Sequence, residues 1–254
     1  MNDMSKTICI TGATSGFGEA MARRFAREGW RVIITGRRRE RLEALARELA
    51  PAQVHAAAFD VSRREAVDTF VAGLPAGFAA VDVLVNNAGL ALGLEPAQRC
   101  DLDQWETMVD TNIKGTLYMT RALLPGMAQR KAGHVVNLGS IAGTYPYPGA
   151  NVYGATKAFM RQFSLNLRAD LHGTGVRVTN IEPGMAETEF SVVRFSGDQG
   201  RAGSVYQGMQ PLVADDIADL IHYAVSAPAH VNINRLEVMP VAQSFGPFPV
   251  ARES

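Results

Sequence analysis

Short apolar segments alternate with helix-like segments along almost the whole chain of 254 residues. The apolar segments predict seven strands: TICIT (7–11), RVIIT (31–35), VHAAAFDV (54–61), VDVLVNNAG (81–89), HVVNLGS (134–140), VRVTNIEPG (176–184) and NRLEVMPV (234–241). Continuous apolar strands separated by helices are typical of a parallel sheet that helices cover on both faces. We therefore expect an α/β fold in a single domain, 1–254, with one long helix over 103–130.

The charge balance and the cysteine content exclude several classes of protein. Lys and Arg together number 25, as do Asp and Glu, so no basic surface field indicates nucleic acid. Two cysteines are too few for a disulfide framework, and Cys9 lies in an apolar strand as a small core residue. The N-terminus leads directly into the first strand, and no apolar run approaches the ~18 residues of a membrane span. We expect a cytoplasmic protein without nucleic-acid or membrane partners.

A glycine-rich turn, TGATSGFG (11–18), follows the first strand and opens the next helix. Gly12, Gly16 and Gly18 would let backbone amides approach a pyrophosphate at the helix N-terminus, where the helix dipole favours negative charge. A glycine turn alone is weak evidence, since tight turns require glycine for conformational reasons. Its position between a strand and a helix is what favours a dinucleotide site.

Arginines follow the second strand, where an NAD site would place a carboxylate for the ribose 2′-hydroxyl. The sequence has Gly36 and then Arg37, Arg38 and Arg39. Guanidinium groups suit a 2′-phosphate because they offer forked donors and a permanent charge. A solvated basic helix start would explain Arg39 but not the missing acid. We therefore expect NADP, bound first by Arg37 and next by Arg38.

Two further strand ends carry polar residues at the same edge of the predicted sheet. Asp60 and Val61 end the third strand, and an acid there could reach the adenine amino group. Asn86, Asn87, Ala88 and Gly89 end the fourth, and would lie above the cofactor in a sheet of this kind.

A serine, a tyrosine and a lysine follow the fifth strand. Tyr153 and Lys157 are i and i+4 neighbours in a helical pattern, so they share a helix face. A free tyrosine titrates near pH 10, and a nearby ammonium would lower its pKa toward useful acid–base chemistry. Ser140, at the strand end, could bind a substrate oxygen. An ordinary exposed Tyr–Lys pair explains the bare pattern as well, and only the cofactor motifs favour catalysis.

Together these motifs identify a family resemblance over essentially the whole chain. TGATSGFG, NNAG, Asn112, Ser140, YGATK and PGMAET occur in the order of the short-chain dehydrogenase/reductase family. The resemblance implies a Rossmann-type, doubly wound, seven-stranded parallel sheet with helices on both faces. It also implies four catalytic roles. Tyr153 is the general acid/base, Lys157 lowers its pKa and binds the nicotinamide ribose, Ser140 positions the reacting oxygen, and Asn112 holds a water in the proton relay.

The same resemblance implies the cofactor contacts. The residues implied are Gly12, Ser15, Gly16, Phe17 and Gly18 along the pyrophosphate, Asn87, Ala88 and Gly89 toward the adenosine, and Pro183, Gly184 and Thr188 beside the nicotinamide. The resemblance implies no metal site.

The second half of the chain resembles a narrower group, the NADP-dependent 3-hydroxy acid dehydrogenases. The matching segments are IEPGMAETEFSVVRFSGD (181–198) and HVNINRLEVMPVAQSFGPFPV (230–250). They imply a small 3-hydroxy acid substrate, such as L-allo-threonine, L-serine or 3-hydroxypropanoate (malonic semialdehyde in reverse), and a homotetramer. PGMAET lacks a residue that some members have, which affects the expected geometry of the following lid, about 187–208. The tail, 243–254, could cross a neighbouring subunit or cover a sheet edge.

A 3-hydroxy acid requires a cation for its carboxylate. The lid offers Arg194 and Arg201, of which we expect Arg194 to bind substrate; a solvated lid arginine is the alternative. Tyr147 could shape the substrate pocket, although an aromatic there is equally typical of packing.

Two other functions are compatible with parts of this pattern. A 3-oxoacyl thioester or carrier-protein reductase would use the same catalytic groups on a different substrate. A non-catalytic NADP sensor would need none of the four catalytic groups, and the presence of all of them argues against it.

Overall fold

The computed structural model describes residues 6–195 and 197–246, which form one parallel sheet with helices on both faces. Its strands are β1 (Thr7–Ile10), β2 (Arg31–Gly36), β3 (Val54–Ala58), β4 (Val83–Asn86), β5 (Gly133–Leu138), β6 (Val176–Pro183) and β7 (Arg235–Val238). They lie in the order β3-β2-β1-β4-β5-β6-β7, and every neighbouring pair is parallel. The predicted Rossmann-type, seven-stranded sheet is therefore confirmed.

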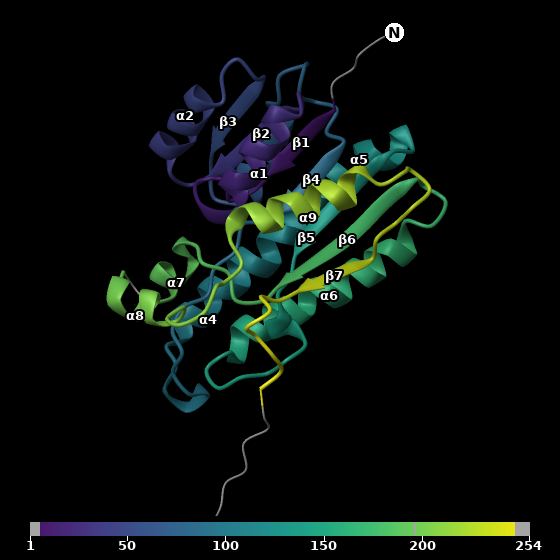
Figure 1. Ribbon diagram of the computed structural model, residues 1–254. Coiled ribbons are helices and arrows are strands. Elements are labelled where there is room, and N and C mark those ends of the chain that lie inside the picture. Colours follow the sequence, from purple (N-terminus) through teal and green to yellow (C-terminus); the bar gives the residue numbers. More distant parts are fainter. Residues whose placement is uncertain (1–5, 196, 247–254) are drawn as a thin grey trace, which may run out of the picture.

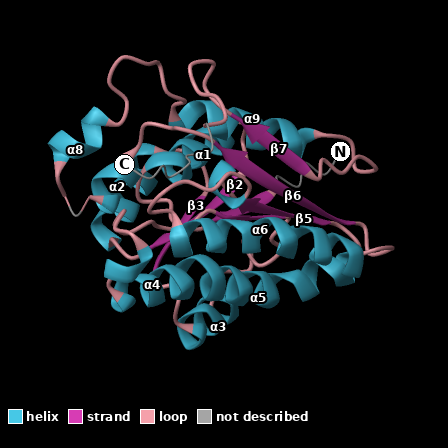
Figure 2. Ribbon diagram, turned by 90° about the horizontal axis from the view of Figure 1, so that it is seen from below, coloured by secondary structure: helices cyan, strands magenta, loops and turns pink. Residues whose placement is uncertain are grey.

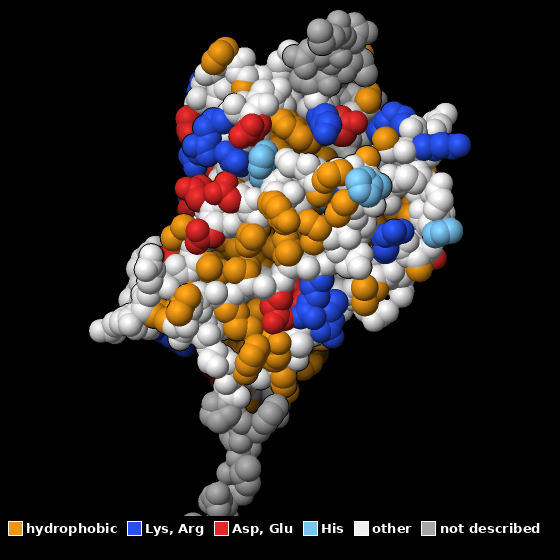
Figure 3. All heavy atoms as spheres, turned by 45° about the vertical axis from the view of Figure 1, so that its right-hand side comes forward, with side chains coloured by type: hydrophobic (Ala, Val, Ile, Leu, Met, Phe, Trp, Pro, Cys, Tyr) orange, Lys and Arg blue, Asp and Glu red, His pale blue; other side chains and the backbone are white. Residues whose placement is uncertain are grey.

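Two layers of helices enclose the sheet (Figures 1 and 2). One face carries α1 (Gly16–Arg27), α2 (Arg39–Glu48) and α9 (Ala214–Ser226). The other carries α3 (Arg64–Ala72), α4 (Leu102–Val109), α5 (Gly115–Arg130) and α6 (Asn151–Asp170). On the outside, hydrophobic side chains gather across the middle of the face in Figure 3. No helix within the described ranges is long and apolar enough to cross a membrane.

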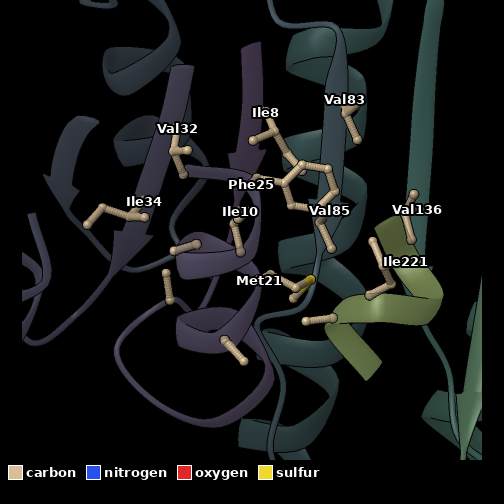
Figure 4. Packing of buried hydrophobic residues seen from close by; sticks show 14 of the residues in the cluster. Ile8, Ile10, Met21, Phe25, Val32, Ile34, Val83, Val85, Val136 and Ile221 are labelled. Atoms are coloured by element: carbon tan, nitrogen blue, oxygen red, sulfur yellow. The ribbon is translucent and has the colours of Figure 1, made fainter. Parts of the chain in front are cut away.

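The core consists of strand side chains packed against these helices. On the face of α1 and α9, Phe25, Met21 and Ile221 contact the β-branched residues of the central strands (Figure 4). All three are fully buried, and burying a side chain of this size stabilises the fold by about 1.5–3 kcal/mol. Cys9 is fully buried on the opposite face, as the sequence predicts.

The helical segment over Leu102–Arg130 contains a π turn at Asp110–Lys114, which joins α4 to α5. The prediction of one continuous helix misses this turn. The buried Asn112 side chain lies in it and bonds to the loop after β4, so tertiary contacts explain the local widening. Such turns are frequent at functional sites.

The lid contains two short helices, α7 (Glu189–Arg194) and α8 (Gln199–Ser204), where the sequence pattern predicts none. Each begins at a capping side chain. Thr188 accepts a hydrogen bond from the amide of Phe190, and Asp198 accepts one from the amide of Arg201. Short helices of this kind depend on their caps rather than on an apolar period, so periodicity does not reveal them.

The strand order reverses between β1 and β4, which pair in parallel. Crossovers leave these two strands in opposite directions, and sheets of this kind bind ligands in the resulting crevice at the carboxyl ends of the strands. The glycine turn after β1 and the NNAG segment after β4 therefore lie at the same point.

Candidate active site

A cavity of about 1190 Å³ lies at the carboxyl edge of the sheet. The predicted site residues that line it are Gly12, Ser15, Gly16, Phe17, Arg37, Arg38, Asp60, Val61, Asn87, Ala88, Gly89, Ser140, Tyr147, Tyr153, Lys157, Pro183, Gly184, Thr188 and Arg194. Two other predicted residues, Gly18 and Asn112, do not line it. Residues far apart in the sequence thus meet in one place.

The glycine turn has the backbone that its sequence predicts. Gly12 and Gly16 have positive φ angles of 68° and 55°, a conformation that glycine adopts at little cost. A Cβ on Gly18 would collide with the carbonyl oxygen of Gly12 and lie 2.7 Å from Nδ2 of Asn87. Only glycine therefore allows α1 to begin so close to β1, which leaves room at its N-terminus for a phosphate group.

Asn87 joins this turn to the end of β4. Its Nδ2 donates to the carbonyl oxygens of Thr11 (2.8 Å) and Gly12 (3.1 Å). In return, Thr11 Oγ1 accepts from the amides of Asn87 (3.0 Å) and Ala88 (2.9 Å). The two cofactor-side loops are therefore one hydrogen-bonded unit. Asp60 lies further along this edge and accepts from the amide and hydroxyl of Ser62.

The arginines after β2 divide into one at the rim and one on the glycine turn. Arg37 is exposed and lines the cavity. Arg38 donates to Thr14 Oγ1 (2.6 Å from Nη2) and to Ser15 Oγ (2.9 Å). Arg41, which the sequence analysis missed, donates to Glu189 on the lid. Its i, i+3 spacing from Arg38 on one helix face was the available signal.

Tyr153, Lys157 and Ser140 meet at the opposite end of the cavity. Tyr153 and Lys157 are 8% and 7% exposed, so the exposed-pair alternative is wrong. Ser140 lies just beyond β5, begins a 3₁₀ turn at Ile141–Gly143, and acts to lower the pKa of Tyr153. Lys157 Nζ donates to the carbonyl oxygen of Leu138 at 2.7 Å.

The structure does not show the expected lowering of the Tyr153 pKa by Lys157, because burial is the largest effect on this group. Burial raises the pKa of Tyr153 to about 12, although the Ser140 hydrogen bond and the Arg194 charge act in the opposite direction. Lys157 Nζ donates to the carbonyl oxygen of Leu138 and lies over the tyrosine ring, 5.8 Å from its centroid. Burial also lowers the pKa of Lys157 to about 8, because a desolvated ammonium is disfavoured.

Asn112 is 2% exposed and holds the loop after β4 in place. Its Oδ1 accepts from the amide of Leu90, and its Nδ2 donates to the carbonyl oxygen of Leu90, both at 2.9 Å. Nδ2 also donates to Thr156 Oγ1 on α6 (3.0 Å). The side chain therefore joins three elements around the catalytic groups; its expected role with a relay water stays a prediction.

The lid closes the substrate end with an arginine. The Arg194 guanidinium lies 5.0 Å from the ring centroid of Tyr153 and 5.3 Å from that of Phe190. Its Nη2 donates to Tyr147 Oη at 2.9 Å, and its Nε is buried without a hydrogen-bond partner. A buried, unpaired N–H on a cation is costly, so this group is suited to receive an anion.

The glycine-turn geometry, the Ser–Tyr–Lys cluster and the parallel sheet all match one family. The sequence profile of the short chain dehydrogenase family matches residues 6–198. This chain belongs to the short chain dehydrogenase family.

Relatives within the family are similar over nearly their whole length. A serine 3-dehydrogenase of Rhizobium radiobacter is 61% identical over 251 residues, which cover 99% of this chain and 100% of the relative. The NADP-dependent 3-hydroxy acid dehydrogenase YdfG of Escherichia coli (strain K12) is 56% identical over 247 residues, with 97% and 99% covered. The solved closed form of serine dehydrogenase complexed with NADP⁺ superposes with a TM-score of 0.96 at 55% identity, covering 97% of this chain and 100% of that one.

This short chain dehydrogenase also uses a residue that sequence reasoning missed. Gln243, after β7, accepts a hydrogen bond from the amide of Met185 at 2.8 Å and contacts Gly184. It thereby fixes the segment that the family resemblance assigns to the nicotinamide. A single glutamine in an irregular segment gave no signal. The tail beyond 246 lies outside the described residues, and within them no group of three or more His, Cys, Asp or Glu side chains is placed to hold a metal ion.

Proposed function

We propose that this chain transfers a hydride between the nicotinamide of NADP and the β-carbon of a small 3-hydroxy acid, such as L-serine, L-allo-threonine or 3-hydroxypropanoate. The observation that carries the proposal is the Arg194 guanidinium above Tyr153, which places a cation for a carboxylate beside an acid/base group. The names of the serine 3-dehydrogenase and 3-hydroxy acid dehydrogenase relatives support the same substrate class.

The cofactor half of the cavity fits a dinucleotide with a 2′-phosphate. The glycine turn and the start of α1 would hold the pyrophosphate, because the glycines of the turn have no side chains to obstruct it. Asn87 would lie toward the adenosine. Arg38 and Arg37 would bind the 2′-phosphate, with Arg38 the better placed of the two. Asp60 with Val61 would lie beside the adenine, and Pro183, Gly184 and Thr188 beside the nicotinamide.

The catalytic half supplies the proton chemistry. NADP, when bound, supplies the hydride acceptor. The β-carbon of the hydroxy acid loses its hydride, while its hydroxyl proton passes to the Tyr153 phenolate and leaves a carbonyl. Ser140 would hydrogen-bond the reacting oxygen. The charges of Arg194 and of Lys157, whose Nζ lies 5.8 Å from the tyrosine ring centroid, would favour the phenolate. Asn112 joins the loop after β4 to α6 through its hydrogen bonds to Leu90 and Thr156.

The charges in the cavity favour hydroxy acids in general over amino acids alone. Arg194 offers a cation for the carboxylate. The two carboxylates among the described lining residues are Asp60, which binds Ser62, and Glu189, which binds arginines near the glycine turn. Neither faces the tyrosine, so the substrate α-ammonium has no carboxylate partner there. We therefore expect 3-hydroxypropanoate, which has no amino group, to be a substrate.

A substrate panel tests the proposal. Reduction of NADP would be followed at 340 nm with L-serine, L-allo-threonine and 3-hydroxypropanoate, each repeated with NAD and with the methyl ester of the acid. We expect turnover with NADP on the free acids and a KM raised at least about tenfold for the esters, because the ester gives Arg194 no charge to pair. If none of the acids reduces NADP but a 3-oxoacyl thioester oxidises NADPH, the thioester reductase is favoured instead.

We also infer a cytoplasmic homotetramer. The hydrophobic side chains gathered across the face in Figure 3, and the 65% exposure of Tyr223 on α9, support burial against other subunits. Light scattering coupled to size-exclusion chromatography would give about four times the 27.4 kDa chain mass. A monomeric mass at micromolar concentration would contradict the tetramer.

A further inference from the structure

The first residue of α7 is bound to the arginines beside the glycine turn. Arg41 Nη1 donates to both carboxylate oxygens of Glu189, at 2.7 and 2.9 Å, and Arg38 Nη1 donates to Oε2 at 3.1 Å. The same Arg38 guanidinium donates to Thr14 and Ser15. A lid carboxylate is thus held by two arginines, one of which, Arg38, the proposed function assigns to the 2′-phosphate of the cofactor.

The last residue of the same helix is the proposed substrate anchor. Arg194 lies five residues after Glu189, which is roughly 8 Å along a helix, and is held over Tyr153 and against Tyr147. Thr188 caps the helix at Phe190, so the segment is a single hydrogen-bonded unit. Movement of Glu189 would therefore move Arg194.

Glu189 is charged in this arrangement. Burial acts to raise the pKa of its carboxyl, but the hydrogen bonds and charges of Arg41 and Arg38 outweigh burial and bring the pKa below its usual range. At neutral pH the group is a carboxylate, which occupies guanidinium donors and reduces the positive field available to another anion.

We propose that Glu189 is a positioning residue that ties α7 to Arg38 and Arg41 and so holds Arg194 over Tyr153, while it competes with the 2′-phosphate of NADP for Arg38. The inference rests on the proposed function, since it takes NADP and a carboxylate substrate as the ligands. It makes a distinctive prediction: removing the charge of Glu189 strengthens the binding of NADP and weakens the binding of the hydroxy acid. A residue that only supported the fold would weaken both.

The test compares Glu189→Gln with Glu187→Gln, which removes another exposed lid carboxylate two residues away. NADP and NAD would each be titrated calorimetrically into the enzyme without hydroxy acid. We expect Glu189→Gln to lower the Kd of NADP about two- to fivefold and to leave that of NAD unchanged, because NAD has no 2′-phosphate. The ion pairs are partly exposed, so larger factors are not expected. Glu187→Gln should change neither Kd.

Two more measurements are the rate of trypsin cleavage in the lid and the KM of the substrate. Trypsin cleavage after Arg201, in the lid, should be about two- to fivefold faster in Glu189→Gln, because α7 loses its attachment. The KM for 3-hydroxypropanoate should rise by a similar factor with kcat little changed, and Glu189→Asp, which keeps the charge, should restore most of the loss.

Three outcomes would overturn the inference: an unchanged or raised Kd for NADP, an equal change for NADP and NAD, or an unchanged rate of cleavage. The binding and cleavage measurements use no hydroxy acid. If no hydroxy acid reacts at all, the proposed function fails, and these two measurements still decide whether Glu189 has the role described.

Discussion

The guanidinium of Arg194 lies 5.0 Å from the ring centroid of Tyr153, and its Nη2 donates to Tyr147 Oη at 2.9 Å. One arginine from the lid therefore contacts the proposed acid/base and a second tyrosine of the pocket wall. Its charge also lowers the pKa of Tyr153 against the larger effect of burial. In the proposed function, a single side chain therefore links substrate binding to proton transfer.

Replacing Arg194 should affect binding more than the chemical step. Arg194→Gln removes the charge that would pair with the substrate carboxylate, and we expect the KM for 3-hydroxypropanoate to rise about ten- to a hundredfold, since a charge-assisted hydrogen bond contributes about 1.5–3 kcal/mol. Steady-state kinetics measure this. The control is Arg201→Gln, because that guanidinium lies over Phe195 instead, 4.7 Å from its ring centroid. Equal effects of the two variants would show that Arg194 has no special role.

The glycine turn gives a prediction about cofactor binding. In Gly18→Ala the new Cβ would collide with the carbonyl of Gly12 and with Asn87, so the turn must open. We expect NADP affinity to fall at least about tenfold, which corresponds to about 1.4 kcal/mol. Gly203→Ala is the matched control, because a Cβ there meets nothing within 4 Å. Calorimetric titration would measure both, and an unchanged affinity in Gly18→Ala would contradict the packing described.

The pKa of Lys157 predicts a pH dependence of stability. Burial lowers this pKa to about 8 from 10.5, so between these values the unfolded chain binds more protons than the folded chain and the free energy of unfolding rises with pH. From pH 8 to 10 we expect a gain of roughly 2 kcal/mol relative to Lys157→Met, which lacks the amine. Above pH 10 the raised pKa of Tyr153 acts oppositely, because the unfolded tyrosine loses its proton first.

Urea denaturation of both proteins at pH 8 and pH 10 would measure this difference, in which all other titrating groups cancel. A difference that stays constant between the two pH values would mean that Lys157 is not desolvated as described.

Replacing Asn112 should lower the free energy of unfolding. In Asn112→Ala the amide and carbonyl of Leu90 lose their buried partners, and each buried, unsatisfied polar group costs about 1–3 kcal/mol. We expect the free energy of unfolding to fall by roughly 2–4 kcal/mol. Asn166→Ala, which removes an exposed bond to Gln162 on α6, should cost less than about 0.5 kcal/mol. Similar losses in the two variants would contradict the account of the π turn.

The sequence predicts the sheet, and the meeting of Ser140, Tyr153 and Lys157 in one place, because both follow local rules. Apolar strand runs, a glycine turn between strand and helix, and an i, i+4 pair depend on nearby residues, and the structure places them as expected. The direction of the Tyr153 pKa could not be predicted this way, because it depends on burial and on where the Lys157 ammonium points.

Contacts between segments that are far apart in the chain could not be predicted from the sequence either. Arg41 and Glu189 are 148 positions apart, and Gln243 lies 58 positions after Met185. Met185 belongs to the PGMAET motif, but neither contact follows from a motif or a periodic pattern. The lid helices depend on single capping residues, which occur in many loops.

The most direct test of the proposed chemistry is NADPH formation at 340 nm by Tyr153→Phe, measured with NADP and 3-hydroxypropanoate beside the wild type. Phenylalanine keeps the ring under Arg194 but removes the hydroxyl that would exchange the substrate proton. We predict a fall in kcat of at least about a hundredfold, with NADP affinity unchanged. Turnover near the wild-type rate would show that Tyr153 is not the acid/base and would contradict the account.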